Sequence, residues 1–299
     1  SISIGCIPAG GALGVLIPPS VMMIILGLYT NTSIGMLYAG GVLPGLMLAG
    51  LFCVYIFVRC LFNKSLGPVL PKEDRSTFRE KLAALKSLIL PVLLILGILG
   101  SIFSGAATPS EAAAIGAAGS VICSAIYRKL NWKNFQEACY STLRFSCMVM
   151  WIIFGASVFT ALYTAIGAQD LAQELLRLIP GGNWGTLIGM QLILLILGCF
   201  LDPTGIIMIS TPIFFPIAIS MGFDPVWFGV LYCINMELGF LTPPFGFNLF
   251  YMQSVAPEGV TMIDIYKSIV PFILIGILGL ILCMIFPQII LWLPELIYK

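Results

Sequence analysis

Two carboxylates and several hydroxyl and amide side chains lie inside long apolar stretches of this sequence. Asp202 stands in the segment FLDPT, and Glu237 stands in the segment NMELG. Burying an ionisable residue in an apolar span is costly, so each is a candidate functional residue. Carboxylate, hydroxyl, amide and main-chain carbonyl oxygens are the ligands that a hard cation such as Na⁺ prefers. The side chains that could supply them are Asp202, Thr204, Ser210, Thr211, Asn235, Glu237 and Thr242.

Each candidate also has a plainer structural explanation. An Asp-Pro turn such as Asp202-Pro203 caps the helix that follows it. A Thr or Asn in a membrane helix often forms a hydrogen bond to a neighbouring helix. Glu237 lies inside a predicted helix and has no capping role, so it would pair with a neighbour or another subunit, or titrate. A third acid, Glu111, follows Thr108 at the start of an apolar stretch and is interpreted as a helix-start residue.

A short apolar phrase that ends in two prolines occurs twice. Residues 13–19 read LGVLIPP and residues 238–244 read LGFLTPP, an offset of 225 (238 − 13). Proline lacks an N–H group and clashes with the carbonyl one turn back, so each Pro-Pro pair predicts a broken helix. Lipid tolerates a break only where protein or a water-filled cavity satisfies the freed backbone groups. Paired breaks in two halves of a chain indicate the binding site of a secondary transporter.

The two breaks would supply both carbonyl ligands and helix dipoles. Gly14 and Gly239 permit unwinding, which frees carbonyls for a cation. The half-helix after each proline pair points its N–H groups at the membrane centre, where they suit an anionic substrate group. The predicted sodium-binding residues are Gly14, Asp202, Thr204, Asn235, Glu237, Gly239 and Thr242. The predicted substrate-binding residues are Pro18, Pro19, Ser20, Pro203, Pro243 and Pro244.

The composition indicates an all-α integral membrane protein. Hydrophobic residues make up 60% of the 299 residues and charged residues only 9%, whereas a soluble domain carries about 25% charged residues. Apolar runs of about 20 residues predict membrane-spanning helices, and the alternating pattern of a β-barrel is absent. The sequence has no histidine, which excludes imidazole acid–base chemistry. We predict that the chain is not an enzyme.

The positive charges predict the orientation of the two broken helices. Eleven of the 14 Lys and Arg residues lie between residues 59 and 144, in two clusters that adjoin apolar spans. Short basic loops mark the cytoplasmic side, and clusters beside apolar spans favour a lipid bilayer rather than nucleic acid as partner. With both clusters inside, the first broken helix (3–29) runs outward and the second (226–252) runs inward. Opposite orientation makes the two copies an inverted repeat.

The remaining pattern predicts further spans and a hairpin. Residues 187–221 are too long for one crossing and are interrupted at 202–205. Each limb of about 15 residues spans roughly 22 Å, less than the ~30 Å hydrocarbon core, which predicts a re-entrant hairpin. Two ordinary spans with a tight turn are the alternative. The other predicted elements are spans at 34–62, 88–103, 112–127, 145–166 and 268–293, a polar loop up to residue 86, a polar linking segment at 128–144 and a short polar helix before residue 180.

The duplication extends past the two Pro-Pro pairs. Ser33 is followed five residues later by Tyr38 and then by Pro44. Thr261 is followed five residues later by Tyr266 and then by a proline. The shared hydroxyl-to-tyrosine spacing supports two copies of one unit.

The sequence resembles the large membrane subunit of the tripartite ATP-independent periplasmic (TRAP) transporters. The matching motifs run in order over nearly the whole chain. They are AGGALGVLIPPS at 9–20, AGGVLPG at 39–45, ATPSEAAA at 107–114, FLDPT at 200–204, GFDPVWFGV at 222–230 and LTPPFGFNL at 241–249.

The resemblance implies a sodium-driven importer in the bacterial inner membrane that works as an elevator. Its substrate would be an organic acid of the sialic acid or C4-dicarboxylate class, and Na⁺ would be co-transported, with no organic cofactor. A periplasmic substrate-binding protein would deliver the substrate, and a small four-helix membrane subunit would join the scaffold. The implied division is a first broken helix (1–30), scaffold helices (31–166), a hairpin with the second broken helix (167–255) and a C-terminal scaffold helix (256–299).

Compared with this family, the sequence is expected to lack the first part, including the first hairpin. The ion site around residues 14–20 would then be half represented. Two other functions stay open: a stand-alone Na⁺/carboxylate carrier of a related elevator fold, and a channel or structural membrane subunit. Dependence on a periplasmic partner separates the first from the tripartite function, and sodium-independent flux would favour the second.

Overall fold

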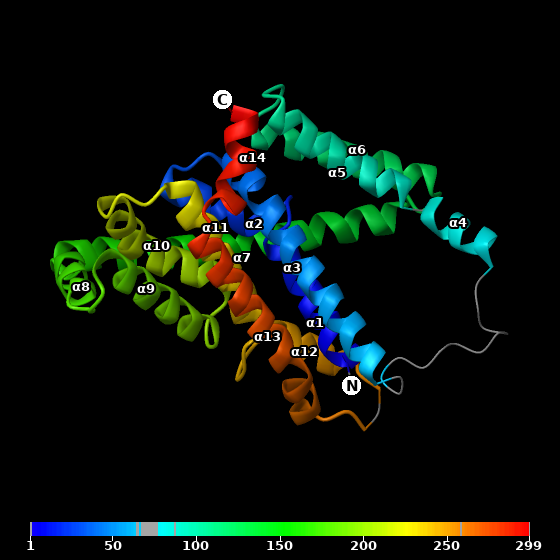
Figure 1. Ribbon diagram of the computed structural model, residues 1–299. Coiled ribbons are helices and arrows are strands. Elements are labelled where there is room, and N and C mark those ends of the chain that lie inside the picture. Colours follow the sequence, from blue (N-terminus) through cyan, green and yellow to red (C-terminus); the bar gives the residue numbers. More distant parts are fainter. Residues whose placement is uncertain (1, 64–65, 67–76, 87, 258, 299) are drawn as a thin grey trace. The chain divides into compact units, whose positions relative to one another are not determined.

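The computed structural model describes residues 2–63, 66, 77–86, 88–257 and 259–298, and its regular elements are helices (Figure 1). The chain forms two compact units, one of residues 60–148 and one that combines Ser1–Arg59 with Val149–Lys299. Helices of the described residues that are long and apolar enough to cross a membrane include Ile34–Phe62, Pro109–Ile126, Trp132–Ala165, Pro203–Ser220 and Met262–Ile285. The prediction of an all-α membrane protein is confirmed.

The first predicted broken helix is present at the first Pro-Pro pair. It consists of α1 (Ile2–Ala12), the short 3₁₀ helix η1 (Leu13–Val15) and α2 (Val21–Thr30). Ser20 caps α2: its hydroxyl accepts the Met23 N–H at 3.5 Å and donates to the Val15 carbonyl. A residue whose side chain satisfies a helix-start N–H fixes where the second half begins.

The second broken helix interrupts the chain at the second Pro-Pro pair. Its halves are α11 (Pro225–Leu241) and α12 (Phe247–Val255), separated by residues 242–246. Asp224 caps α11 by accepting the N–H groups of Val226 and Trp227 at 2.8 and 2.9 Å. The two predicted breaks are therefore confirmed, and both are places where proline removes helical N–H donors.

The two broken helices lie antiparallel within one compact unit. Helix α1 packs beside α12, α2 packs beside α11, and η1 lies against α11. The Asn248 side-chain amide on α12 donates to the Pro8 carbonyl on α1 at 3.2 Å. Because the first half of each copy lies beside the second half of the other, the two copies form the predicted inverted repeat.

The predicted hairpin consists of α9 (Gly182–Gly198) and α10 (Pro203–Ser220), joined by a tip of residues 199–202. Helix α9 packs on α11, and α10 packs on α2 (Figure 1). The limbs contain 17 and 18 residues, or about 26 Å each. Because α10 reaches the length of a membrane span, the choice between a re-entrant hairpin and two ordinary spans stays a prediction. The short polar helix predicted before residue 180 is α8 (Ala168–Arg177).

Helix α7 (Trp132–Ala165) is longer than predicted. The linking segment predicted at 128–144 is helical from Trp132 onward and continuous with the span after it. The prediction was wrong because polar composition does not end a helix: residues 132–154 contain neither Gly nor Pro. Lys133 and Glu137 pair at 4.0 Å with the i, i+4 spacing that supports an exposed helix.

The C-terminal span predicted at 268–293 is two helices, α13 (Met262–Ile285) and α14 (Gln288–Tyr298). The break falls at Phe286, whose φ of −117° and ψ of 79° lie outside the helical region. Pro287 follows, and proline disfavours the helical conformation of the residue before it. The predicted span 34–62 is α3 (Ile34–Phe62). The division into transport and scaffold parts stays a prediction.

The unit of residues 60–148 contains α4 (Phe78–Lys86), α5 (Ile89–Phe103) and α6 (Pro109–Ile126). Helices α5 and α6 pack on each other. Thr108 and Glu111 form a capping box at the start of α6, with the Thr108 N–H bonded to Glu111 Oε2 at 2.7 Å. The structural interpretation of Glu111 is confirmed. Most of the polar loop predicted before residue 77 lies outside the described residues.

Candidate functional site

The tip of the hairpin contacts the second break. The main-chain N–H of Phe245 donates to the carbonyl of Cys199 at 3.3 Å. The rings of Phe200 and Phe245 lie 6.2 Å apart between centroids. The tip and the break, which were predicted separately as parts of one site, therefore meet in the folded chain.

A pair of glycines brings the backbones of α9 and α11 together beside this contact. A Cβ atom on Gly239 would lie 2.8 Å from the Cα of Gly198, and one on Gly198 would lie 2.9 Å from the Cα of Gly239. Backbone atoms cannot move aside as a flexible side chain can, so both positions require glycine. Gly14, which corresponds to Gly239 in the first repeat, has no such neighbour within 4 Å in the described chain. Sequence reasoning selected Gly239 and missed Gly198, whose signal was its place at the end of an apolar limb.

Asp202, Pro203 and Thr204 start α10 at the tip. Asp202 is the N-cap, and one of its carboxylate oxygens accepts the Gly205 N–H at 3.1 Å. Pro203 occupies the first turn, where its missing N–H costs nothing. The Thr204 residue is only 3% exposed. The capping explanation of Asp202 is confirmed, and its role as a sodium ligand stays a prediction.

Thr242, Pro243 and Pro244 form the second break at the C-terminal end of α11. The Thr242 hydroxyl donates to the carbonyl four residues earlier at 2.7 Å, so its oxygen lone pairs are turned to other partners. Pro243 and Pro244 cannot donate to the carbonyls of Gly239 and Phe240 one turn before them. The Gly239 carbonyl instead accepts the Thr242 N–H at 3.3 Å. The Phe240 carbonyl, released from the helical ladder, is the candidate cation ligand.

A buried polar cluster connects α11 to α9 below the break. The Asn235 Nδ2 atom donates to the main-chain carbonyl and to the side-chain Oε1 of Gln191, each at 2.8 Å. Asn235 is fully buried and Glu237 is 2% exposed. Among the described residues, Asn235 Oδ1, Gln191 Nε2 and Glu237 Oε2 are buried without a hydrogen-bond partner. An unpaired buried polar atom costs about 1–3 kcal/mol, so these atoms mark a place for a further ligand or partner.

Asn235 and Glu237 do not point to the same side of α11. Residues two apart on a helix are separated by about 200°, so Glu237 faces away from α9 when Asn235 faces it. The predicted sodium-binding set therefore divides into side chains on the α9 face and a carboxylate on the opposite face. Sequence reasoning missed Gln191, although an amide in an apolar limb was its signal.

Removing the Asn235 amide is expected to destabilise the chain. Asn235→Ala deletes two buried hydrogen bonds and leaves Gln191 Oε1 without its Asn235 partner, which should lower the unfolding free energy by about 2 kcal/mol. Thermal unfolding of the purified complex measures the effect. Asn183→Ala, which removes one exposed hydrogen bond to Met221, is the matched control and should unfold within about 0.5 kcal/mol of the parent. Equal stability of the two variants would contradict the prediction.

The first break packs against α3. Ser20 is 2% exposed, and its carbonyl accepts the Tyr38 hydroxyl at 3.3 Å. Gly41 on α3 approaches the Leu16 carbonyl closely. The predicted site residues of the first repeat therefore form a group separate from the tip residues, as expected if each repeat has its own site. They are Gly14, Pro18, Pro19 and Ser20.

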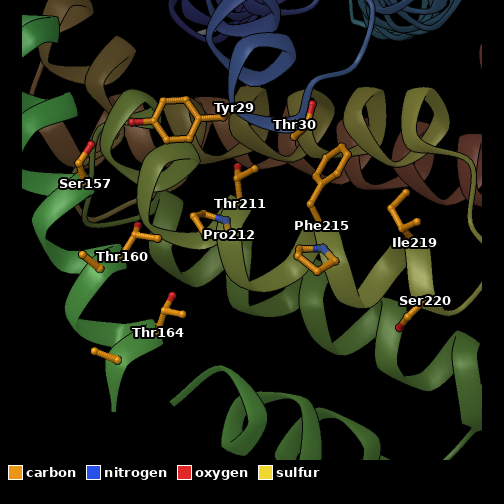
Figure 2. A pocket seen from close by; sticks show the side chains of 13 residues that line it. Tyr29, Thr30, Ser157, Thr160, Thr164, Thr211, Pro212, Phe215, Ile219 and Ser220 are labelled. Atoms are coloured by element: carbon orange, nitrogen blue, oxygen red, sulfur yellow. The ribbon is translucent and has the colours of Figure 1, made fainter. Parts of the chain in front are cut away.

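An open pocket in the same unit lies away from both breaks (Figure 2). Its volume is about 1160 Å³, and residues of α2, α7 and α10 line it. Figure 2 shows the hydroxyls of Thr160, Thr164 and Thr211 around it. Thr211, one of the candidate oxygen ligands, lines this pocket, whereas the predicted sodium-binding and substrate-binding sets contribute no residue to it. The volume of a pocket therefore does not locate the predicted site, whose residues lie at the ends of broken helices.

The family model described as "Tripartite ATP-independent periplasmic transporter, DctM component" matches residues 1–289. The chain belongs to this family. Its agreement with the DctM component covers both breaks and the hairpin, so the site geometry lies wholly within the matched region. The resemblance stated from the sequence motifs is confirmed.

Curated relatives of this DctM-family chain carry different substrate names. It is 35% identical over 294 residues to the C4-dicarboxylate TRAP transporter large permease DctM of Pseudomonas aeruginosa, covering 97% of this chain and 67% of the relative. It is 32% identical over 295 residues to the sialic acid large permease SiaM of Vibrio cholerae, covering 98% and 67%. It is 29% identical over 310 residues to the ectoine large permease TeaC of Halomonas elongata, covering 100% and 69%.

Proposed function

We propose that this DctM-family chain carries out sodium-coupled import of an organic carboxylate of the C4-dicarboxylate or sialic acid class. It would act by an elevator mechanism in the bacterial inner membrane. A periplasmic substrate-binding protein would deliver the substrate, and a small four-helix membrane subunit would complete the membrane part. The observation that carries the proposal is the hydrogen bond from the Phe245 N–H to the Cys199 carbonyl, which joins the hairpin tip to the second break.

One break can serve a cation and an anion together because two helix ends meet there. The C-terminal end of α11 presents carbonyls and the negative end of its dipole, which favour Na⁺. The N-terminal end of α12 presents free N–H groups and the positive end of its dipole, which favour a carboxylate. Neighbouring sites of opposite charge stabilise each other, so binding of one ligand would favour binding of the other.

The substrate class rests on the relatives. Two of them are named for C4-dicarboxylates and sialic acid, both of which carry a carboxylate. The helix N-termini at both breaks suit such a group. The ectoine relative supports a site that relies on backbone dipoles, which allow the substrate to vary, rather than on one fixed charged side chain.

Uptake by the complete membrane complex in proteoliposomes tests the proposal. A panel of labelled organic acids is supplied with and without a sodium gradient and with and without the binding protein. Uptake that needs both supports the tripartite function and identifies the substrate. Sodium-driven uptake without the binding protein would instead indicate a stand-alone carrier, and sodium-independent flux would indicate a channel.

Asp202→Asn is expected to weaken sodium dependence while the fold is kept. Asparagine caps a helix as well as aspartate does, so the variant removes the charge and retains the Gly205 contact. We expect the half-saturating sodium concentration for uptake to rise about tenfold, the equivalent of about 1.4 kcal/mol. Thr204→Ala should act in the same direction.

Asp224→Asn is the matched control for Asp202→Asn. Asp224 caps α11 in the same way but lies at the opposite end of that helix from the break. Its replacement should leave the sodium curve unchanged. A sodium curve for Asp202→Asn that matches the parent would remove Asp202 from the ion site.

A further inference from the structure

A tyrosine on the helix after the second break is hydrogen-bonded to the break itself. The Tyr266 hydroxyl, on α13, donates to the carbonyl of Pro244 at 2.9 Å. Thr261 starts this helix with a capping box in which its hydroxyl accepts the Asp264 N–H at 3.3 Å. The cap fixes the residue at which α13 begins. It thereby fixes the position of Tyr266, five residues after Thr261, relative to the break.

The Pro244–Phe245 peptide is held at both ends. Its carbonyl accepts the Tyr266 hydroxyl, and its N–H donates to the Cys199 carbonyl at the hairpin tip. A peptide unit is planar, so the direction of the carbonyl determines the direction of the N–H. The Tyr266 hydroxyl therefore determines how the break presents its N–H to the tip, although Tyr266 itself does not touch the tip.

A related contact, one residue further along the chain, occurs in the first repeat. Tyr38, on α3, donates from its hydroxyl to the Ser20 carbonyl at 3.3 Å, directly after the first proline pair. Tyr38 follows Ser33 by the spacing that separates Tyr266 from Thr261, and the Ser33 hydroxyl likewise accepts a helix-start N–H, from Met36 at 3.4 Å. Each repeat thus places a tyrosine of the helix after the break against a backbone carbonyl at or beside its proline pair, although the two carbonyls differ in position by one residue.

We propose that Tyr266 is a positioning residue that holds the hairpin tip against the second break through the Pro244–Phe245 peptide. The proposal rests on the proposed function in one respect: the tip is where sodium is expected to bind, so a loosened tip should weaken sodium activation. Whether Tyr266 holds the tip in place does not depend on the proposed function and can be measured without sodium.

The native thiol of Cys199 reports on the tip directly. In the complete membrane complex, Tyr266→Phe removes the hydroxyl and keeps the ring. We expect the alkylation rate of Cys199 by a small methanethiosulfonate, measured by peptide-resolved mass spectrometry, to rise about fivefold, as expected for loss of one hydrogen bond. Cys139, an exposed thiol in the other compact unit, is the internal reference and should react at an unchanged rate.

Two tyrosine variants control for general loosening. Tyr251→Phe removes an exposed hydroxyl on α12, and Tyr38→Phe removes the hydroxyl at the other break. Neither should change the Cys199 rate. A Tyr266→Phe rate equal to the parent, or an equal rise in Tyr38→Phe, would overturn the proposal.

Sodium-dependent uptake by the same preparations separates the two ideas. Tyr266→Phe should raise the half-saturating sodium concentration about fivefold and leave the maximal rate within about twofold. If uptake by the parent complex does not depend on sodium, the proposed function fails, whereas the Cys199 rates still decide the role of Tyr266.

Discussion

Gly239→Val is expected to reduce substrate uptake at least about thirtyfold, the equivalent of about 2 kcal/mol of overpacking. The Cβ atom would lie 2.8 Å from the Cα of Gly198 and 3.2 Å from that residue's carbonyl carbon and oxygen. Because all of the nearest atoms belong to the backbone, α9 and α11 would have to separate. The separation would fall beside the hydrogen bond between Phe245 and Cys199 and would open the tip from the break.

The measurement is uptake into proteoliposomes at matched amounts of inserted complex. Gly50→Ala, on α3, is the control because a Cβ there meets no atom of the described chain within 4 Å. It should transport within about twofold of the parent, since alanine is favoured over glycine inside a helix. Undiminished uptake in Gly239→Val would show that the close approach of the two helices is not needed for transport.

Local rules predicted the breaks because proline chemistry acts within one helical turn. The prolines at 18–19 and 243–244 remove donors whatever surrounds them, and the halves α1, α2, α11 and α12 follow from that. The boundaries that were wrong, at Trp132 and Phe286, depend on weaker signals. A polar stretch without Gly or Pro continued α7, and one proline at 287 ended α13.

The partners of the site residues could not be predicted because they depend on packing between distant segments. Nothing local to Asn235 reveals that its amide bonds to Gln191, 44 residues away. The approach of Gly198 to Gly239 likewise requires that the tip and the break meet. The sequence identified the candidate residue types, because polar side chains inside apolar spans are costly. Their distances and partners depend on how the hairpin packs against the inverted repeat.

Replacing both Pro243 and Pro244 by alanine is expected to close the second break and reduce uptake at least about fiftyfold. Each proline disfavours a continuous helix by about 3 kcal/mol relative to alanine, so the double variant shifts the balance toward helix by several kcal/mol. When only a small fraction of molecules keeps the break open, the apparent affinity for sodium and for the substrate is reduced to that fraction of its original value. Helix α11, which ends at Leu241, would extend toward α12.

Hydrogen exchange and uptake together decide this prediction. In the variant, the two new amides at residues 243 and 244 should be protected because they join the i→i−4 ladder, while membrane insertion is unchanged. Pro271→Ala is the matched control, because α13 runs without interruption through Pro271 and loses no break when it is replaced. That control should keep uptake within about twofold of the parent, since alanine fits a helix interior. Full uptake in the double variant together with protected amides would mean that transport does not use the freed carbonyl of Phe240.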